Sequence, residues 1–338
     1  MRTDAAALAA GIPNLVLRPY AGEEDLSAIV RIINAENEAD HLDERLTEES
    51  ERSSYAHPSA QFDPARDVVL AELDGIVVGV AGQDWVDTRD GELREHRLWG
   101  AVDPAHRRRG IGTALLADNE RRARAIEPAP VDGRAKAFGS FAGEGRPATA
   151  LLERSGYEMA RWFFEMLRPS LDGVAAVPLP AGFELRPAGP GDYPSIWRAN
   201  REAFRDHWGG SDESEAAMRR FLETPDTDPT LWLIAWEGSE IAGGVINAIF
   251  AHENEAMGYR RGWLESVFTR RAWRRRGLAQ ALIARSLLLL RERGMTSAGL
   301  GVDAANPSGA LGLYETAGFA VHERFVAWRK PMEEGPLT

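Results

Sequence analysis

The chain has 338 residues, 44% of them hydrophobic and 27% charged, which is typical of a globular protein with roughly two domains. Its formal net charge of −12 argues against a general binder of nucleic acid or of anionic membranes. The sequence contains no cysteine, so it excludes disulfides, thiolate metal sites and cysteine nucleophiles, and it fits a cytoplasmic protein.

The first half of the sequence predicts alternating strands and helices. Apolar residues recur at helical spacing in 23–37, whereas two β-branched runs flank Asp74-Gly75, a strong short signal for a hairpin. We expect strands at 15–19, 68–73, 76–80, 93–102, near Ala135, and from Tyr157 and from Trp162 onward. We expect helices at 23–37, 47–56, 110–126 and 147–154.

Residues 169–182 contain three prolines among small residues without periodicity, which indicates a linker. The second half then repeats the order of elements. We expect strands at 183–187, 231–236, 241–249, 263–269, 298–302 and two within 319–330, and helices at 193–204, 213–222, 277–293 and 308–317. The sequence therefore predicts two α/β domains, 1–168 and 183–332. Each has a mixed sheet in the order β-α-α-β-β-β-α-β-α-β-β.

One short motif occurs in both halves, each time between a predicted strand and a predicted helix. The first copy is Arg107-Arg108-Arg109-Gly110-Ile111-Gly112, and the second is Arg274-Arg275-Arg276-Gly277-Leu278-Ala279. The two glycines Gly110 and Gly277 are separated by 277 − 110 = 167 residues, and the later pair Gly156 and Gly318 by 318 − 156 = 162. Because the two spacings nearly agree, the sequence indicates the duplication of a whole domain.

Such a glycine turn can present several backbone N–H groups to a pyrophosphate at the positive end of a helix. The alternative is that the arginines form only a solvated surface patch, and the repetition of the motif favours anion binding. A dinucleotide-binding fold is less consistent with the motif, because neither copy has the spacing G-x-G-x-x-G.

The second half adds a later asparagine and a tyrosine placed four residues before a Gly-Phe pair. The set comprises Arg274, Gly277, Ala279, Asn306, Tyr314 and Gly318-Phe319. It resembles the GNAT superfamily of N-acetyltransferases, and the resemblance covers both halves, from about residue 15 to 330. Two fused domains of this kind are similar to the mycothiol synthase branch and related actinobacterial tandem acetyltransferases.

The resemblance implies acetyl-CoA as co-substrate, and the seven scattered histidines predict no metal site. The pantetheine arm of acetyl-CoA would follow the backbone of Val267, Phe268 and Thr269, and Asn306 would contact the same arm. The further cofactor-binding residues implied are Arg274, Arg275, Arg276, Gly277, Leu278, Ala279 and Gln280. A possible second CoA site comprises Arg107, Arg108, Arg109, Gly110, Ile111 and Gly112.

The resemblance also implies two catalytic residues in the second half. Tyr314 stands where the family places the acid that protonates the thiolate, and Glu265 matches a glutamate that serves as base, directly or through water. The corresponding residues of the first half are Leu98 and Leu152, neither of which exchanges protons, and Glu144 replaces Asn306. We therefore expect a catalytic second domain and a catalytically degenerate first domain.

Structural roles for these residues remain open from the sequence. Tyr314 can be an interior aromatic, Glu265 can pair with Arg260, Arg261 or Arg270, and His96 can act as a base in the first copy. For the acceptor we expect Asp206, His207 and Trp208, although Trp208 can equally pack between helices and His207 can cap one.

The expected function is transfer of an acetyl group to a primary amine of a small molecule by direct attack, without nucleic-acid or membrane partners. A cysteinyl glucosamine-inositol is one candidate acceptor that the resemblance suggests. Two other functions remain open: a non-catalytic acyl-CoA-binding protein, and an acetyltransferase for peptide or protein N-termini.

Overall fold

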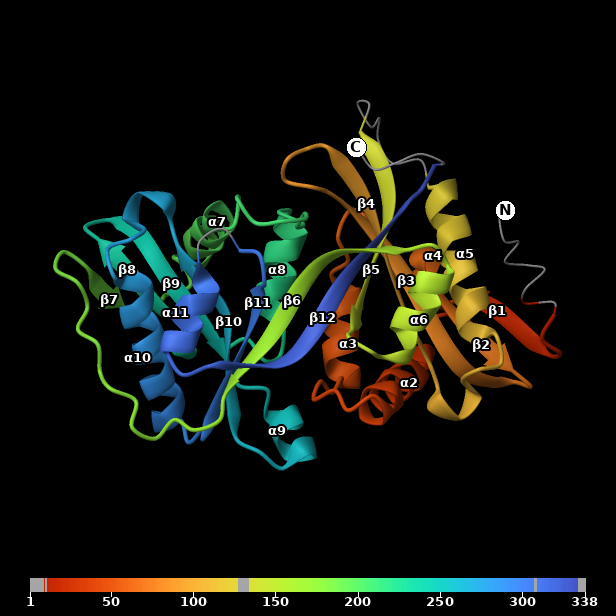
Figure 1. The fold of residues 1–338 in the computed structure, drawn as a ribbon, viewed down its shortest axis with the longest axis horizontal. Helices are drawn as coiled ribbons and strands as arrows, with labels where there is room; N and C mark the ends of the chain where they lie inside the picture. The colour runs from red at the N-terminus through yellow and green to blue at the C-terminus, as the bar shows by residue number, and fades with distance from the viewer. Residues whose placement is uncertain (1–8, 10, 127–133, 307–308, 334–338) are drawn as a thin grey trace. The chain divides into compact units, whose positions relative to one another are not determined.

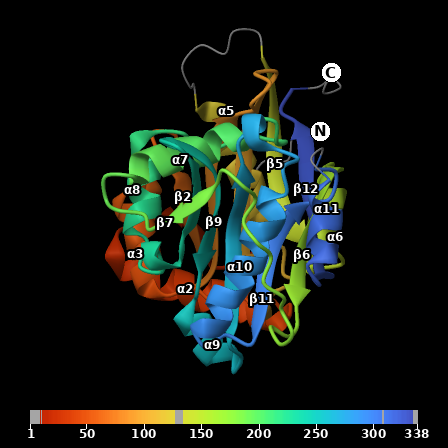
Figure 2. The same cartoon turned by 90° about the vertical axis from the view of Figure 1, so that its left-hand side faces the viewer.

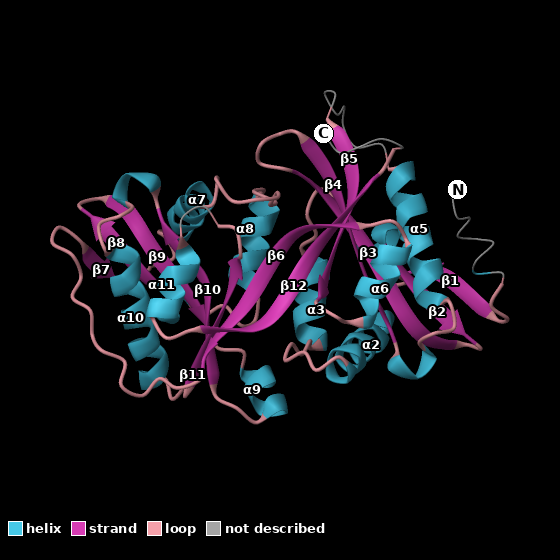
Figure 3. Cartoon of the chain, viewed as in Figure 1, coloured by secondary structure: helices cyan, strands magenta, loops and turns pink. Residues whose placement is uncertain are grey.

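The computed structural model describes residues 9, 11–126, 134–306 and 309–333, which belong to two compact units. Unit 1 comprises residues 1–160, 209–225 and 326–338, and unit 2 comprises 161–208 and 226–325. The units therefore differ from the predicted bounds in three segments, because 161–168 belong to unit 2 whereas 209–225 and 326–332 belong to unit 1. Figures 1 and 3 show the helices and strands of both units.

The sheet of unit 1 has the strand order β1-β2-β3-β4-β5-β12. Strands β1 to β4 pair antiparallel, and β4 and β5 pair parallel. These strands are β1 (Leu15–Pro19), β2 (Val68–Leu73), β3 (Ile76–Asp87), β4 (Leu93–Val102), β5 (Ala135–Gly143) and β12 (Ala320–Pro331), of which β12 belongs to unit 1 from residue 326 onward. The end of β12 lies beside β5, where the Met332 amide donates to the Lys136 carbonyl at 2.9 Å.

Helices cover both faces of the unit 1 sheet. Ile29 and Ile32 of α2 pack against one face, and Ile111 and Leu115 of α5 pack against the other. Each helix places apolar residues three or four positions apart, which lines one helical face with them. The helices of unit 1 are α2 (Leu26–Ala39), α3 (Glu48–Ala56), α4 (Pro64–Asp67), α5 (Ile111–Ala125), α6 (Pro147–Arg154) and α8 (Glu215–Glu223).

Polar contacts hold the segment 209–225 within unit 1. The Arg89 amide donates to the Gly209 carbonyl at 3.1 Å, and His57 Nε2 lies 2.7 Å from a Glu223 carboxylate oxygen. Arg220 donates to the His57 carbonyl at 2.9 Å. Helix α8, which the sequence places in the second copy, is therefore part of unit 1.

The sheet of unit 2 has the strand order β6-β11-β10-β9-β8-β7. Its strands are β6 (Glu158–Arg168), β7 (Glu184–Arg186), β8 (Leu233–Glu237), β9 (Glu240–Ala248), β10 (Arg261–Thr269) and β11 (Ser297–Asp303). Its helices are α7 (Tyr193–Ala203), α9 (Ala251–Met257), α10 (Leu278–Glu292) and α11 (Ala310–Thr316). Helix α10 crosses one face of this sheet (Figure 2), where Leu282 and Leu287 share a core with Val245 and Leu300.

Most predicted elements are present near their expected bounds, but the strand predicted at 76–80 extends to Asp87 as β3, and further differences occur at the end of each copy. The sequence predicted two closing strands per copy, and the structure has single strands, β6 and β12. Neither 158–168 nor 320–330 contains glycine, proline or asparagine, so neither offers the chain a residue typical of a turn. The short helices α4 and α9 were not predicted, because four and seven residues are too few to show a helical period. Among the described residues, no helix is both long enough and apolar enough to span a membrane.

Candidate functional site

The two glycine turns adopt the same backbone conformation. Arg108 and Gly110 have φ values of 64° and 88°, and Arg275 and Gly277 have values of 61° and 78°. Each glycine is the N-cap of the helix that follows it, α5 or α10. The left-handed region is costly for an arginine, so its repetition shows that the duplication preserved this turn in detail. The first amides of each helix have no partner within the helix and suit an anion.

The first arginine of each turn contacts the end of an earlier helix. Arg107 lies 2.9 Å from Glu36 and 2.6 Å from Asp40 at the end of α2. Arg274 donates to the carbonyl of Ala203, the last residue of α7, at 2.9 Å and pairs with Asp206 at 3.2 Å. A cation is favourable at the C-terminal end of a helix, so both arginines hold their turns in place.

The other side chains of the second turn differ in exposure. Arg275 and Arg276 are both exposed, and Arg276 pairs with Glu237 at 2.6 Å with its guanidinium 4.4 Å from the Phe183 ring centre. Leu278 is buried in the core, so only its backbone can meet a ligand. Gln280 borders a cavity of about 200 Å³ between α10, α11 and residues 173–177.

Next to the second turn, the two parallel strands of unit 2 diverge. Strands β10 and β11 pair only over 261–263 and 297–299, so within the sheet the segment 267–269 pairs with β9 alone, and the Thr269 carbonyl accepts a hydrogen bond from Arg274 at 3.2 Å. A Cβ atom at Gly301 of β11 would meet nothing within 4 Å, so open space borders the strand. An extended pantetheine arm can hydrogen-bond to such an exposed peptide edge.

In unit 1 the corresponding divergence is bridged. Strands β4 and β5 pair over 93–97 and 135–139, and beyond this point the Ser140 hydroxyl donates to the Leu98 carbonyl at 2.9 Å. The residue 162 positions later in the chain is Val302, which has no hydroxyl. The peptide edge is therefore partly closed in unit 1 and open in unit 2.

Glu265 lies at a β-bulge between β9 and β10. Leu264 pairs with Asn247 and Ser266 pairs with Ile246, which leaves Glu265 as the extra residue, and Glu265 is exposed. A bulge changes the direction of a side chain and frequently adjoins an active site. In unit 1, Leu98 occupies a regular pair of β4 with β3 and is only 2% exposed. The sequence predicted the carboxylate but did not predict the bulge.

Tyr314 is buried in the core of unit 2, and its ring lies edge-on to Phe319 at 6.2 Å. Burial raises the pKa of the Tyr314 phenol to about 12. The Phe319 amide donates to the Tyr314 carbonyl at 3.0 Å, and the Tyr157 amide donates to the Leu152 carbonyl at the same distance. Leu152 and Tyr314 therefore occupy equivalent positions in the two copies. Leu152 is an aliphatic core residue, whereas Tyr314 carries a phenol.

His96 lies in the interior of unit 1, with 1% of its surface exposed. Burial, together with the charges of Lys136 and Arg94, lowers the pKa of its imidazole to about 4. A neutral, enclosed imidazole cannot reach an amine that enters from solvent, so the structure gives no support to His96 as a base.

The expected acceptor residues all contact other residues of unit 2, Asp206 at the surface and His207 and Trp208 half-buried. Asp206 lies 2.5 Å from Arg271 in addition to its pair with Arg274, and the hydrogen bond from Arg271 lowers the pKa of its carboxyl group. The ring of His207 lies 4.4 Å from that of Phe204. The ring of Trp208 lies 6.0 Å from that of Phe163. Asp206 thus fixes the second turn. Asn306 is partly buried just after β11, and Glu144 of unit 1 is exposed.

Comparison with known proteins agrees with this geometry. The sequence profile of the acetyltransferase (GNAT) family matches residues 193–319, and that of the acetyltransferase (GNAT) domain matches residues 64–159. A mycothiol acetyltransferase of Geodermatophilus obscurus is 30% identical over 318 residues, which cover 90% of this chain and 94% of the relative. The chain belongs to the GNAT family of acetyltransferases. A mycothiol acetyltransferase of Salinispora arenicola is 33% identical over 76% of this chain and 79% of its own length.

Solved structures also resemble this tandem GNAT acetyltransferase. A GCN5-related N-acetyltransferase from Sphaerobacter thermophilus has a TM-score of 0.68 and 28% identity, with 96% of this chain and 98% of that chain covered. A tandem GNAT protein from the clavulanic acid biosynthesis pathway has the same TM-score at 17% identity, covering 95% of this chain and all of that chain, and shows the fold alone. The predictions of the family and of two GNAT domains are confirmed.

Proposed function

We propose that the enzyme transfers the acetyl group of acetyl-CoA to a primary amine of a small molecule, and that unit 2 performs the reaction. The asymmetry between the copies carries the proposal. Unit 2 combines an open peptide edge with Glu265 and Tyr314, whereas unit 1 has a bridged edge with Leu98 and Leu152. The curated relatives named mycothiol acetyltransferase support a small molecule as acceptor.

The cofactor would bind through backbone groups. The amides of residues 275–279 and the N-terminus of α10 would hold the pyrophosphate, and the edge of Val267, Phe268 and Thr269 that β11 leaves unpaired would hold the pantetheine arm. Asn306 and Gln280 flank these two segments in the chain and would contact the cofactor. Arg274 would act indirectly, because its guanidinium already holds the turn against α7.

The reaction needs a neutral amine and a stabilised leaving thiolate. An alkylammonium has a pKa of about 10, so a base must remove its proton before the nitrogen can attack the thioester carbonyl. Glu265 would take this proton, directly or through water, since its exposed carboxylate lies on the strand that bears the peptide edge. The carbonyl oxygen would gain negative charge and accept a hydrogen bond from the amide of Val267 or Phe268. The carbon–sulfur bond then breaks and the electron pair leaves with sulfur, while the attacking nitrogen releases its second proton to water and becomes the nitrogen of a neutral amide.

The pKa of Tyr314 limits what the phenol can do. Complete proton transfer from a phenol of pKa about 12 to a thiolate of pKa about 8.5 is uphill by about 3.5 units, or roughly 5 kcal/mol. Tyr314 would therefore act mainly by donating a hydrogen bond to the departing sulfur, and the thiolate would take its proton from water. The raised pKa keeps the donor form present at every physiological pH.

The test is turnover by the purified full chain against a panel of acceptors. The panel should contain a cysteinyl glucosamine-inositol, simple alkylamines, aminosugars and peptides with free N-termini, with product mass as the readout. We expect acetylation of small amines and loss of turnover in Glu265→Gln. Acetylation confined to peptides would favour the protein N-terminal alternative.

A second function follows from the conserved geometry of both turns. Acetyl-CoA binding without turnover of any amine in the panel would favour an acyl-CoA-binding protein. Both turns keep the same left-handed residues, so unit 1 can hold CoA without catalysing transfer. Counting the CoA bound per chain by calorimetry, with and without Gly110→Ala, separates one site from two.

A further inference from the structure

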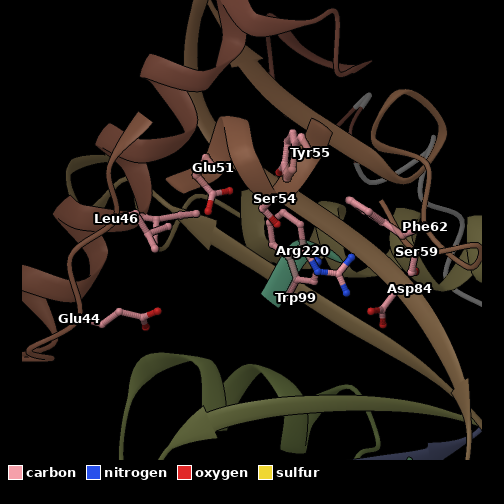
Figure 4. A pocket seen from close by; sticks show the side chains of 11 residues that line it. Glu44, Leu46, Glu51, Ser54, Tyr55, Ser59, Phe62, Asp84, Trp99 and Arg220 are labelled. Carbon is pink, nitrogen blue, oxygen red and sulfur yellow. The ribbon is translucent and has the colours of Figure 1, made fainter. Parts of the chain in front are cut away.

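Unit 1 contains a cavity that none of the residues proposed for acetyl transfer lines. Its volume is about 390 Å³, which lies in the usual range for small-molecule sites. The cavity is bounded by α2, the segment that follows it, α3, β3, β4 and α8 (Figure 4). The side chains used below are Glu44, Glu51, Tyr55, Phe62, Trp99 and Arg220.

The charges of the cavity wall are not balanced. Arg220 donates to the His57 carbonyl at 2.9 Å and lies 3.8 Å from Asp212. Asp84, which also lines the cavity, is paired with Arg97. In Figure 4, Arg220 and Asp84 lie on one side of the cavity and Glu44 and Glu51 on the other.

Glu44 and Glu51 have no cationic partner among the described residues. Glu44 accepts hydrogen bonds through its backbone carbonyl, and the Glu51 amide donates to the Thr47 carbonyl, so neither contact involves the carboxylate. The Tyr55 hydroxyl is buried and also lacks a hydrogen-bond partner. Buried polar groups in proteins are nearly always paired, so the Tyr55 hydroxyl favours a hydrogen-bonding ligand at this end of the cavity, where Glu44 is exposed and Glu51 is half-buried.

Aromatic rings form the apolar part of the wall. The Tyr55 ring is held edge-on between Tyr20 at 5.3 Å and Phe62 at 5.9 Å. The Trp99 ring lies over Gly82, where a Cβ atom would come within 2.1 Å of it, and 36% of Trp99 is exposed. Ring faces and carboxylates both attract an organic cation, the rings through their quadrupole and the carboxylates through charged hydrogen bonds.

We propose that this cavity binds an organic cation that carries a primary ammonium group. The ammonium lies at Glu44 and Glu51, and the apolar part of the ligand packs on Phe62 and Trp99. The nearest equivalents of catalytic groups in unit 1 are Leu98 and Leu152, so the bound amine is held and not acetylated. This second ligand site goes beyond the acetyl transfer proposed for unit 2.

Titration of the carboxylates gives the site a pH dependence. Burial and the charge of Glu44 raise the pKa of Glu51 to about 7. The charged and titratable groups that line the cavity with Glu51 are Glu44, Tyr55, Asp84 with its partner Arg97, and Arg220 with its neighbour Asp212. Because a bound ammonium favours the ionised carboxylates, binding releases protons near neutral pH and strengthens as the pH rises from 6 to 8.

The experiment is calorimetric titration of the full chain with n-butylammonium chloride. Butan-1-ol and butyrate are the matched neutral and anionic probes. We expect saturable binding of the cation alone, at least tenfold tighter at pH 8 than at pH 6. The measured heat should change with the ionisation enthalpy of the buffer, because protons are released.

Variants localise the site. Glu51→Gln and Glu44→Gln should each weaken binding at pH 8 at least tenfold, whereas Glu49→Gln, at an exposed position on the same helix, should leave it unchanged. Tyr314→Phe should also leave binding unchanged, so failure of this proposal is distinguishable from failure of the acetyl-transfer proposal. Thermal unfolding confirms that each variant is folded.

Three results would overturn the proposal: no saturable binding at pH 8, equal binding of butan-1-ol, or unchanged binding in Glu51→Gln. If the variants do not fold, the wild-type chain still gives an answer. A carbon-13 titration should show the pKa of the Glu51 carboxyl falling when n-butylammonium is added, and an unchanged pKa contradicts the site.

Discussion

Removing the hydroxyl of Tyr314 tests the proposed chemistry most directly. In Tyr314→Phe the ring still packs against Phe319, so the fold of unit 2 is preserved. A hydrogen bond to a charged group contributes about 1.5 to 3 kcal/mol. Loss of such a bond to the departing thiolate should lower kcat about 10- to 150-fold. The KM for acetyl-CoA should change little, because the bond forms only as charge develops on sulfur.

The assay is release of free thiol from acetyl-CoA at saturating amine. The matched control is Tyr157→Phe, which removes another buried phenol, one that lies 3.1 Å from Glu120 in unit 1. This control loses a hydrogen bond to a carboxylate, so it should lose about 1.5 to 3 kcal/mol of stability and keep its kcat. Because burial raises the pKa of Tyr314 to about 12, its titration should cause no loss of kcat up to pH 10. A kcat within twofold of wild type in Tyr314→Phe, or an equal loss in both variants, would refute the reasoning.

Three further outcomes are expected. Glu265→Gln should lower kcat about 100-fold or more near pH 7.5, with partial recovery above pH 9, where more of the amine is already neutral; a loss independent of pH contradicts its role as base. Both glycines have positive φ, so Gly277→Ala and Gly110→Ala should each lower the unfolding free energy by about 1 to 2 kcal/mol. Only Gly277→Ala should also raise the KM for acetyl-CoA, and Gly110→Ala should leave activity unchanged. Equal activity losses in the two variants would mean that unit 1 takes part in turnover. Hydrogen bonds from Arg18 lower the pKa of Asp25, so its stabilisation is present above the ordinary pKa and is lost as the pH falls through the lowered value. Asp25→Asn should therefore reduce the unfolding free energy at pH 7 by about 1 to 3 kcal/mol and have little effect in strong acid. Denaturant unfolding at both pH values measures this, and a reduction of equal size at the two pH values contradicts the reasoning.

The sequence predicted most of the helices and strands, because their information is local. Thr47 is an example, since it was expected at the start of a helix and its hydroxyl accepts from the Ser50 amide at 3.0 Å as the N-cap of α3. The glycine turns were equally predictable, because a left-handed residue before a helix favours glycine. The difference between Leu98 and Glu265 was predictable, because the duplication allows each residue of one copy to be compared with the equivalent residue of the other copy.

The features that the sequence did not predict depend on pairing between distant residues. The bulge at Glu265 arises from the register of β10 against β9, and no residue type in the sequence indicates it. The hydrogen bond from Ser140 to the Leu98 carbonyl depends on how far β4 and β5 diverge, which the sequence does not show. The cavity of unit 1 includes Arg220 from α8, which the sequence order assigns to the other copy.

The exchange of terminal segments has a consequence for biosynthesis. Unit 1 begins at the start of the chain but obtains its last strand from residues 326–331. At about 5 to 20 residues per second, a ribosome needs roughly 10 to 30 seconds to make the stretch between residues 160 and 326. The edge of β5 at Lys136 therefore has no β12 beside it throughout that interval. Cutting the gene at the linker would leave the first fragment without residues 326–331 of β12 and the second without residues 161–168 of β6.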